Sequence, residues 1–172
     1  MNNSQLQQCF AQIRNGDQEA FSALYHDMKE PVFTVICRIT ADRDAAEDVM
    51  QELFVKLYCA PPSDVQNLRA WIFKAARNLA IDYMRKPKIH ELPEEIQAES
   101  VPFEDSVGLR LDIERALQQL KEEERELVTL HLNADLKFRE IAEITNVPLG
   151  TVLWRYQKAI HRLKNNFSGG MS

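Results

Sequence analysis

Residues 138–152 read FREIAEITNVPLGTV, which predicts a short amphipathic helix, a tight turn and the opening of a second helix. Small Ala142 would let the two helices cross closely, and Val147 would fill the corner between them. The second helix continues with an apolar face at helical spacing, formed by Val152, Tyr156, Ala159 and Leu163. The segment therefore predicts two packed helices joined by a turn.

The same second helix carries a basic stripe on another face. Arg155, Lys158 and Arg162 are spaced at i, i+3 and i+7, and no acidic residue follows Glu143. A helix-turn-helix protein places such a helix in the major groove, where its N-terminal residues reach base edges and basic side chains hold phosphates. The competing interpretation is a solvated charged face on an ordinary helical hairpin. The absence of acids favours DNA binding.

The rest of the chain is helical in pattern as well, because apolar residues recur every three or four positions and no alternating run appears. The predicted fold class is all-α. We expect helices over residues 5–15, 17–29, 31–40, 44–58 and 68–85, then over 109–120, 121–132, 137–145 and 149–165. Asp17 and Asp44 suit helix N-caps, and Pro31 and Pro148 suit helix starts.

The composition divides the chain into two small domains. Residues 89–112 hold seven acids, one arginine and two prolines without a sustained apolar period, which is linker composition. We expect a helical bundle over 1–88, a flexible acidic linker over 89–112, a helix-turn-helix domain over 113–166 and a disordered tail over 167–172. The net charge of −5 comes from the linker, since residues 66–88 carry six basic side chains against one acid.

Two helices of the first half carry polar faces of different character. The helix over 44–58 sets an apolar face against an acidic one made of Asp44, Glu47, Asp48, Gln51 and Glu52. The helix over 68–85 lines one side with Lys74, Asn78, Asp82 and Arg85, and its positive track is widened by Arg77 and Lys86. Trp71 is expected in the core, because it has apolar neighbours on both sides. The competing interpretation of each polar face is an ordinary solvent-exposed helix surface with no binding role.

Three segments, in this order and spacing, together resemble the ECF (extracytoplasmic-function) sigma factors of the sigma-70 family. In the second half the matching residues are Leu117, Leu120, Arg125, Glu140-Ile141-Ala142 and Gly150-Thr151-Val152. In the first half the matching runs are AEDVMQELF over 46–54, LRAWIF over 68–73 and ARNLAIDY over 76–83. The resemblance covers about residues 17–163, with the linker excepted.

The resemblance implies a factor that binds core RNA polymerase, directs it to promoter DNA and helps to open that DNA. The factor would contact polymerase at the clamp helices of the largest subunit and at the flap of the second-largest subunit. The residues implied for the clamp-helix contact are Asp48, Gln51, Glu52 and Phe54. An anti-sigma protein that covers the DNA-facing surfaces would be a further partner.

The resemblance also implies two sets of DNA contacts. For the minus-ten element the implied residues are Lys74, Arg77, Asn78, Asp82, Arg85 and Lys86, with a base-capturing loop that contains Pro61, Pro62, Ser63 and Asp64. For the minus-thirty-five element they are Thr151, Leu153, Trp154, Arg155, Lys158 and Arg162. The family usually follows Gly-Thr-Val with Lys-Ser-Arg, whereas this chain has Leu153-Trp154-Arg155. Leu153 or Trp154 would then pack on a thymine methyl group or be buried against a partner, which leaves the base preference open.

Three other classes of function fit the sequence less well. A dimeric helix-turn-helix repressor has no evident use for the second basic helix over 68–85. An adaptor that only sequesters a partner would not need basic tracks in both halves. An enzyme would need a phosphate-binding glycine loop, a nucleophile elbow or a metal motif, and the sequence contains none of these. We therefore expect no catalytic residue, no metal and no cofactor.

Cysteine usage and hydropathy favour the cytoplasm. Cys9, Cys37 and Cys59 are odd in number and lie in apolar helical contexts, so we expect buried thiols rather than disulfides. No apolar run approaches the roughly 18–20 residues of a membrane span, and the polar opening residues lack a signal pattern. We expect a cytoplasmic protein without membrane insertion.

Overall fold

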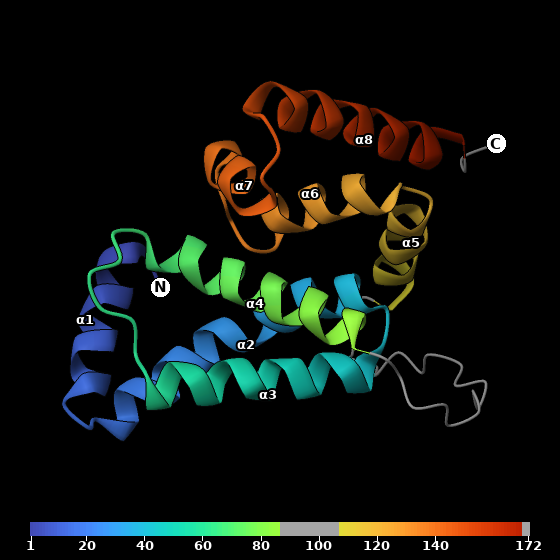
Figure 1. The fold of residues 1–172 in the computed structure, drawn as a ribbon. Coiled ribbons are helices and arrows are strands. Elements are labelled where there is room, and N and C mark those ends of the chain that lie inside the picture. Colours follow the sequence, from blue (N-terminus) through green and yellow to red (C-terminus); the bar gives the residue numbers. More distant parts are fainter. Residues whose placement is uncertain (87–106, 170–172) are drawn as a thin grey trace.

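The computed structural model describes residues 1–86 and 107–169, and in these ranges it contains eight helices and no strand (Figure 1). The helices are α1 (Asn3–Arg14), α2 (Gln18–Thr40), α3 (Arg43–Cys59), α4 (Leu68–Arg85), α5 (Val107–Gln118), α6 (Glu122–Leu132), α7 (Phe138–Thr145) and α8 (Leu149–Gly169). The prediction of an all-α fold with two helical regions, α1–α4 and α5–α8, is confirmed. Most of the expected linker and part of the expected tail lie outside the described residues.

α2 is the central helix of the first region and packs against α1, α3 and α4. Its buried face repeats at helical spacing and consists of Ala20, Leu24, Met28, Val32, Val35 and Ile36. Full burial of a large apolar side chain contributes about 1.5–3 kcal/mol, so this face holds the four helices together. The outer faces of α3 and α4 are left to solvent, where binding residues can lie.

The predicted helix break at Pro31 is wrong, because α2 runs from Gln18 to Thr40 with Pro31 inside it. A proline in a helix interior removes one backbone hydrogen bond and costs about 3 kcal/mol. Met28 and Val32, on either side of it, are fully buried, so the packing of α2 outweighs the local cost. The helix ends at Thr40, as expected, and its C-cap residue Ala41 has a φ of 52°, in the left-handed region.

One of the two predicted N-caps is confirmed. The Asp17 carboxylate accepts hydrogen bonds from the backbone N–H groups of Glu19 and Ala20, at 2.9 and 3.1 Å. At α3 the cap is Asp42 rather than the expected Asp44, and it accepts from the Ala45 N–H at 3.1 Å. The N-cap therefore lies two residues earlier than expected, and the helix begins at Arg43.

The three thiols differ in exposure. Cys9 is buried and its Sγ donates to the Ala20 carbonyl oxygen at 3.0 Å, whereas Cys37 is half-buried. Burial raises the pKa of both thiols. Cys59, the last residue of α3, is exposed, so the prediction of a buried thiol is wrong there. No helix in the described part of the chain is long and apolar enough to cross a bilayer.

α7 and α8 form the predicted helix-turn-helix. Asn146 makes the turn with a φ of 55°, and the Val147 N–H donates to the Ala142 carbonyl oxygen at 3.1 Å. Asparagine adopts left-handed backbone more readily than most residues, which explains its place here. The predicted inner face of α8 is confirmed, with Val152 and Ala159 fully buried and Tyr156 and Leu163 packed beside them.

The two helical regions are in direct contact, with α6 against α2 and α7 against α4 (Figure 1). One cluster of buried apolar side chains extends across both regions. From the second region it includes Leu127, Leu130, Leu136 and Ile141. In this structure the two regions therefore share part of their core.

Candidate nucleic-acid and polymerase interfaces

α4 presents most of its predicted polar residues to solvent. Its start is fixed by two asparagines: the Asn67 side chain accepts from the Ala70 N–H at 3.1 Å, and Asn3 of α1 accepts from the Leu68 N–H at 2.8 Å. A fixed start determines which side chains face outward. The exposed members of the predicted set are Lys74, Asn78, Asp82, Arg85 and Lys86.

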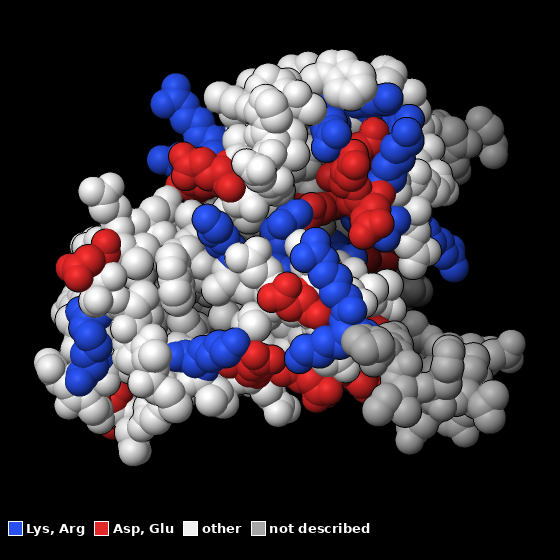
Figure 2. Space-filling model, in the orientation of Figure 1, with Lys and Arg blue, Asp and Glu red and all other residues white. Residues whose placement is uncertain are grey.

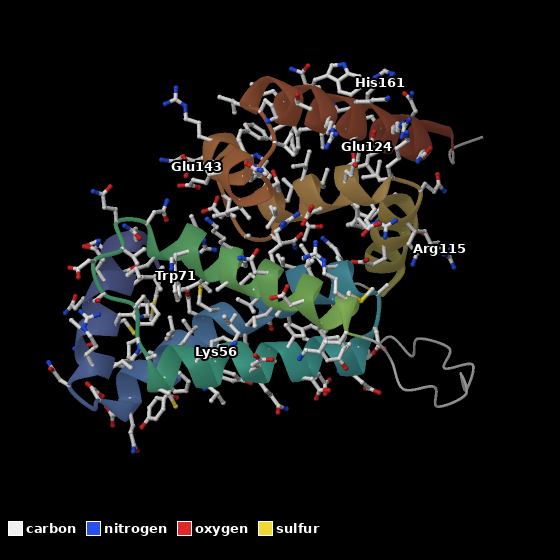
Figure 3. All side chains as sticks on the ribbon, viewed as in Figure 1. Lys56, Trp71, Arg115, Glu124, Glu143 and His161 are labelled. Carbon is white, nitrogen blue, oxygen red and sulfur yellow. The ribbon has the colours of Figure 1, made fainter. Side chains whose placement is uncertain are left out.

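Arg77 is less exposed than the other predicted DNA contacts of α4, and Trp71 is more exposed than expected. Arg77 lies against α6, where its Nε and Nη2 donate to the two carboxylate oxygens of Glu126 at 2.6 and 3.3 Å. The two side chains are 19% and 20% exposed, so the guanidinium is not open to DNA in this conformation. Trp71 (Figure 3), which was expected in the core, is 36% exposed, whereas the next two residues, Ile72 and Phe73, are fully buried.

Arg77 belongs to a polar seam between the two helical regions. Three other side chains of the first region donate hydrogen bonds across this seam. Arg38 donates to Glu114 (2.9 Å), Thr129 (3.0 Å) and Asn133 (2.7 Å). Arg69 donates to the Ala134 carbonyl oxygen (2.7 Å), and Asn67 donates to Glu140. Figure 2 shows acidic and basic atoms side by side where the two regions meet. One face of α4 is thus covered by the second region.

The loop of residues 60–67, between α3 and α4, is held against α1. Arg14 donates to the Pro62 carbonyl oxygen and Asn3 donates to the Gln66 carbonyl oxygen, both at 2.6 Å. Pro62 is buried, Pro61 is half-buried, and Ser63 and Asp64 are exposed. A hollow beside the loop is lined in part by Gln7, Arg14 and Asp64. Contacts with α1, as well as the two prolines, therefore order this loop.

α3 presents an exposed acidic face that includes Asp48, Gln51 and Glu52. Lys56, one turn further along, forms an ion pair with Glu52 at 2.7 Å (Figure 3). The hydrogen bond from Lys56 lowers the pKa of the Glu52 carboxyl, which favours its ionised form. The face is suited to a basic partner.

The expected aromatic anchor of α3, Phe54, does not point to solvent. It is 4% exposed, and its ring packs edge-on at 4.8 Å from Tyr25 and 6.4 Å from Phe21. The exposed apolar side chains of α3 are instead Val55 and Tyr58, at 60% and 45%. Sequence reasoning missed them, although Val55 follows Gln51 by four positions and so shares the acidic face.

The predicted basic stripe of α8 is largely paired within its own region. Arg155 forms an ion pair with Glu123 at 3.1 Å, and Arg162 with Glu124 at 2.8 Å, the latter carboxylate being buried between α6 and α8 (Figure 3). Lys158 makes a different contact, with its Nζ 4.7 Å from the centroid of the Trp154 ring. Two of the three cations are therefore turned toward α6.

The outward face of α8 includes Leu153, Trp154, Gln157 and His161. Leu153 is 37% and Trp154 is 58% exposed, and His161 points away from α6 (Figure 3). Mostly uncharged atoms cover α8 in Figure 2, with charges gathering where it meets α6. Sequence reasoning missed Gln157 and His161, although they follow Trp154 by three and seven positions and so lie on its face.

Comparisons with known proteins give a consistent result over both regions. Residues 24–88 match the family model "Sigma-70 region 2", and residues 110–163 match "Sigma-70, region 4". Among curated relatives, ECF RNA polymerase sigma factor RpoE of Cereibacter sphaeroides is 31% identical, with 88% of each chain covered. ECF RNA polymerase sigma factor SigW of Bacillus subtilis is 29% identical, with 89% of this chain and 91% of the relative covered.

Two solved structures have the same fold. One is CnrH in complex with the cytosolic domain of CnrY, with a TM-score of 0.64, 20% identity and coverage of 94% of this chain and 96% of the other. The second is sigma factor RpoE in complex with the anti-sigma factor NepR from Bartonella quintana, with a TM-score of 0.64, 22% identity and coverage of 86% and 96%. With both sigma-70 regions matched in order and curated relatives aligned over most of their length, the chain belongs to the ECF RNA polymerase sigma factors of the sigma-70 family.

Proposed function

We propose that this sigma factor divides promoter recognition between α4 and α8 while α3 binds core RNA polymerase. Sigma factors initiate transcription at specific promoters and are not themselves catalysts. The finer assignment of residues to each step is inferred from the faces described above. We infer from this function that the protein works in the cytoplasm, where polymerase and chromosome are found in bacteria.

The observation that carries the proposal is the outward face of α4. Asn78 and Asp82 offer hydrogen-bonding groups to base edges, and Lys74, Arg85 and Lys86 offer cations to the backbone of a single strand. The ordered loop of residues 60–67 lies at the start of the same helix. We infer that this loop captures an unpaired base and that α4 holds the neighbouring strand.

Base capture explains how opening proceeds without ATP. Extruding a base costs a few kcal/mol, and stacking and hydrogen bonds in a receiving site return a comparable amount. A loop that is already ordered loses less conformational entropy when a base binds. The balance is close, so opening depends on polymerase to hold the rest of the DNA.

The polymerase contact is proposed for the acidic face of α3. Asp48, Gln51 and Glu52 would meet a basic partner, with Val55 as the apolar centre of the contact. Tyr58 extends the apolar part by one turn. Phe54, buried among aromatic rings, would support this helix from within.

The experiment is transcription with purified core polymerase. Asn78→Ala should lose promoter opening while polymerase binding is retained, because Asn78 lies on α4 and not on α3. A swap of loop residues 61–64 should have the same effect. Gln8→Ala, an exposed amide on α1, is the matched control and should behave like the parent chain. Failure of the parent chain to bind core polymerase, or unchanged opening and promoter preference in Asn78→Ala, would reject the proposal.

Regulation by an anti-sigma protein is a further part of the proposal. It is supported by the likeness to sigma factor RpoE of Bartonella quintana, solved with the anti-sigma factor NepR, and by the exposed faces of α4 and α8 proposed to contact DNA. Pull-down with the chain as bait tests it: a partner that blocks association with core polymerase is expected.

A further inference from the structure

We propose that Leu153 and Trp154 recognise the 5-methyl groups of thymines in the upstream promoter element, with Lys158 holding the Trp154 ring in place. The inference rests on the proposed DNA-binding role of α8 and makes it more specific. It names the base class that this helix selects.

The first step is that the arginines of α8 are not available to contact bases. Bidentate contact of arginine with guanine is the commonest specific contact in the major groove. Arg155 and Arg162 are instead paired with Glu123 and Glu124 of α6, at 3.1 and 2.8 Å. The outward face of α8 therefore offers no predicted arginine to a guanine edge in this conformation.

The second step is what that face offers in place of arginine. Leu153 and Trp154 lie in the first turns of the second helix of the helix-turn-helix, where such proteins contact base edges. They are 37% and 58% exposed, and they are the exposed large apolar side chains of the described part of α8. In the major groove the apolar group available to them is the thymine methyl.

The third step concerns the choice between DNA and a protein partner. Two neighbouring apolar side chains make a small patch, and Gln157, Lys158 and His161 follow it along the helix. Protein-docking patches are larger and continuous, on the order of several hundred Å². A pair of side chains flanked by a cation and an amide suits one or two methyl groups beside phosphates, and Gln157 could donate to and accept from an adjacent adenine.

The fourth step is the role of Lys158 as a positioning residue. Its Nζ lies 4.7 Å from the centroid of the Trp154 ring, one turn away on the same helix. A cation over the ring restricts the rotamers of an otherwise exposed side chain. The same ammonium adds positive charge beside the groove.

The test removes the methyl groups and nothing else. Holoenzyme made with the full chain first selects preferred upstream sequences from a randomised duplex library. Each selected thymine is then replaced by deoxyuridine, and binding is measured. We expect thymine enrichment in the upstream element and an affinity loss of about four-fold for each contacted methyl removed, which corresponds to the transfer of about one CH₂ group.

Variants assign the effect to the proposed side chains. In Trp154→Ala and Leu153→Ala the difference between thymine and deoxyuridine should shrink toward none, while Leu132→Ala, an exposed leucine at the end of α6, should keep it in full. Lys158→Gln should reduce the difference partially, and Lys158→Arg should restore it.

Two results would overturn the inference. One is equal binding of thymine and deoxyuridine duplexes by the parent chain, a measurement that requires no variant to fold. The other is an undiminished methyl effect in Trp154→Ala and Leu153→Ala together. Either result, obtained with a holoenzyme that still initiates transcription, leaves the proposed function standing. Failure of the parent chain to associate with polymerase would reject both the proposed function and this inference.

Discussion

Removing the ion pair between Arg77 and Glu126 should weaken the contact between the two helical regions. The perturbation is Glu126→Gln, which keeps the shape of the side chain and removes its charge. In the packed conformation Arg77 is only 19% exposed and its Nε and Nη2 groups bind the Glu126 carboxylate, so the side chain is poorly placed to bind a DNA phosphate. The variant should therefore favour the conformation in which α4 is uncovered.

The magnitude follows from the burial of the pair. An exposed ion pair is worth about 0–1 kcal/mol, and breaking a fully buried pair costs about 3–5 kcal/mol. Arg77 and Glu126 are 19% and 20% exposed, which places the loss between these limits, at about 1–3 kcal/mol. Such a change shifts the ratio of separated to packed molecules by roughly 5- to 150-fold.

The assay is energy transfer between a dye on the exposed Cys59 and a dye on a cysteine introduced at the exposed position Asn165. Glu126→Gln should move molecules toward longer distances and strengthen binding of single-stranded minus-ten DNA to the holoenzyme. Glu123→Gln is the matched control, because its carboxylate is on the same helix but pairs with Arg155 inside the second region. An unchanged distance distribution in Glu126→Gln, or an equal change in Glu123→Gln, would refute the reasoning.

Three further predictions concern single side chains. Phe54→Ala should lower the free energy of unfolding by about 3–5 kcal/mol, as measured by denaturant titration, and a loss below about 1 kcal/mol would contradict its place in the aromatic core. Replacing Lys158 by Gln should weaken promoter binding across sequences and flatten its logarithmic salt slope by about one unit; an unaltered slope would count against a phosphate contact. Of the three thiols, Cys59 should react with an aromatic disulfide reagent fastest at pH 8, since burial raises the pKa of Cys9 and Cys37 and leaves little thiolate; three equal rates would disprove this.

The helical faces were predictable because apolar periodicity reports directly on burial. The inner face of α8 and the outward residues of α4 follow from spacing alone, since a helix fixes the angle between successive side chains. Pro31 shows the limit of a rule applied to one residue. The preference of proline for a helix start placed a boundary at Pro31, but the burial of Met28 and Val32 in the bundle was not visible in the sequence.

The residues of the candidate sites were predictable from the sequence, but the ion pairs that these residues form were not. Arg77 and Glu126 are 49 positions apart, and nothing in either helix alone selects the other as partner. The same holds for Arg162 and Glu124, which are 38 positions apart. Which arginines are paired depends on how α6 lies between α4 and α8, and that is a property of the tertiary structure.

The glutamates of α6 also affect how the protein responds to salt. Glu123, Glu124 and Glu126 act as built-in counterions for arginines of α8 and α4. An arginine that moves from one of them to a phosphate frees a cation from DNA, but the vacated carboxylate attracts a cation in turn. The net uptake of ions by such an exchange is close to zero, so promoter affinity should decline less steeply with ionic strength than a count of basic residues implies.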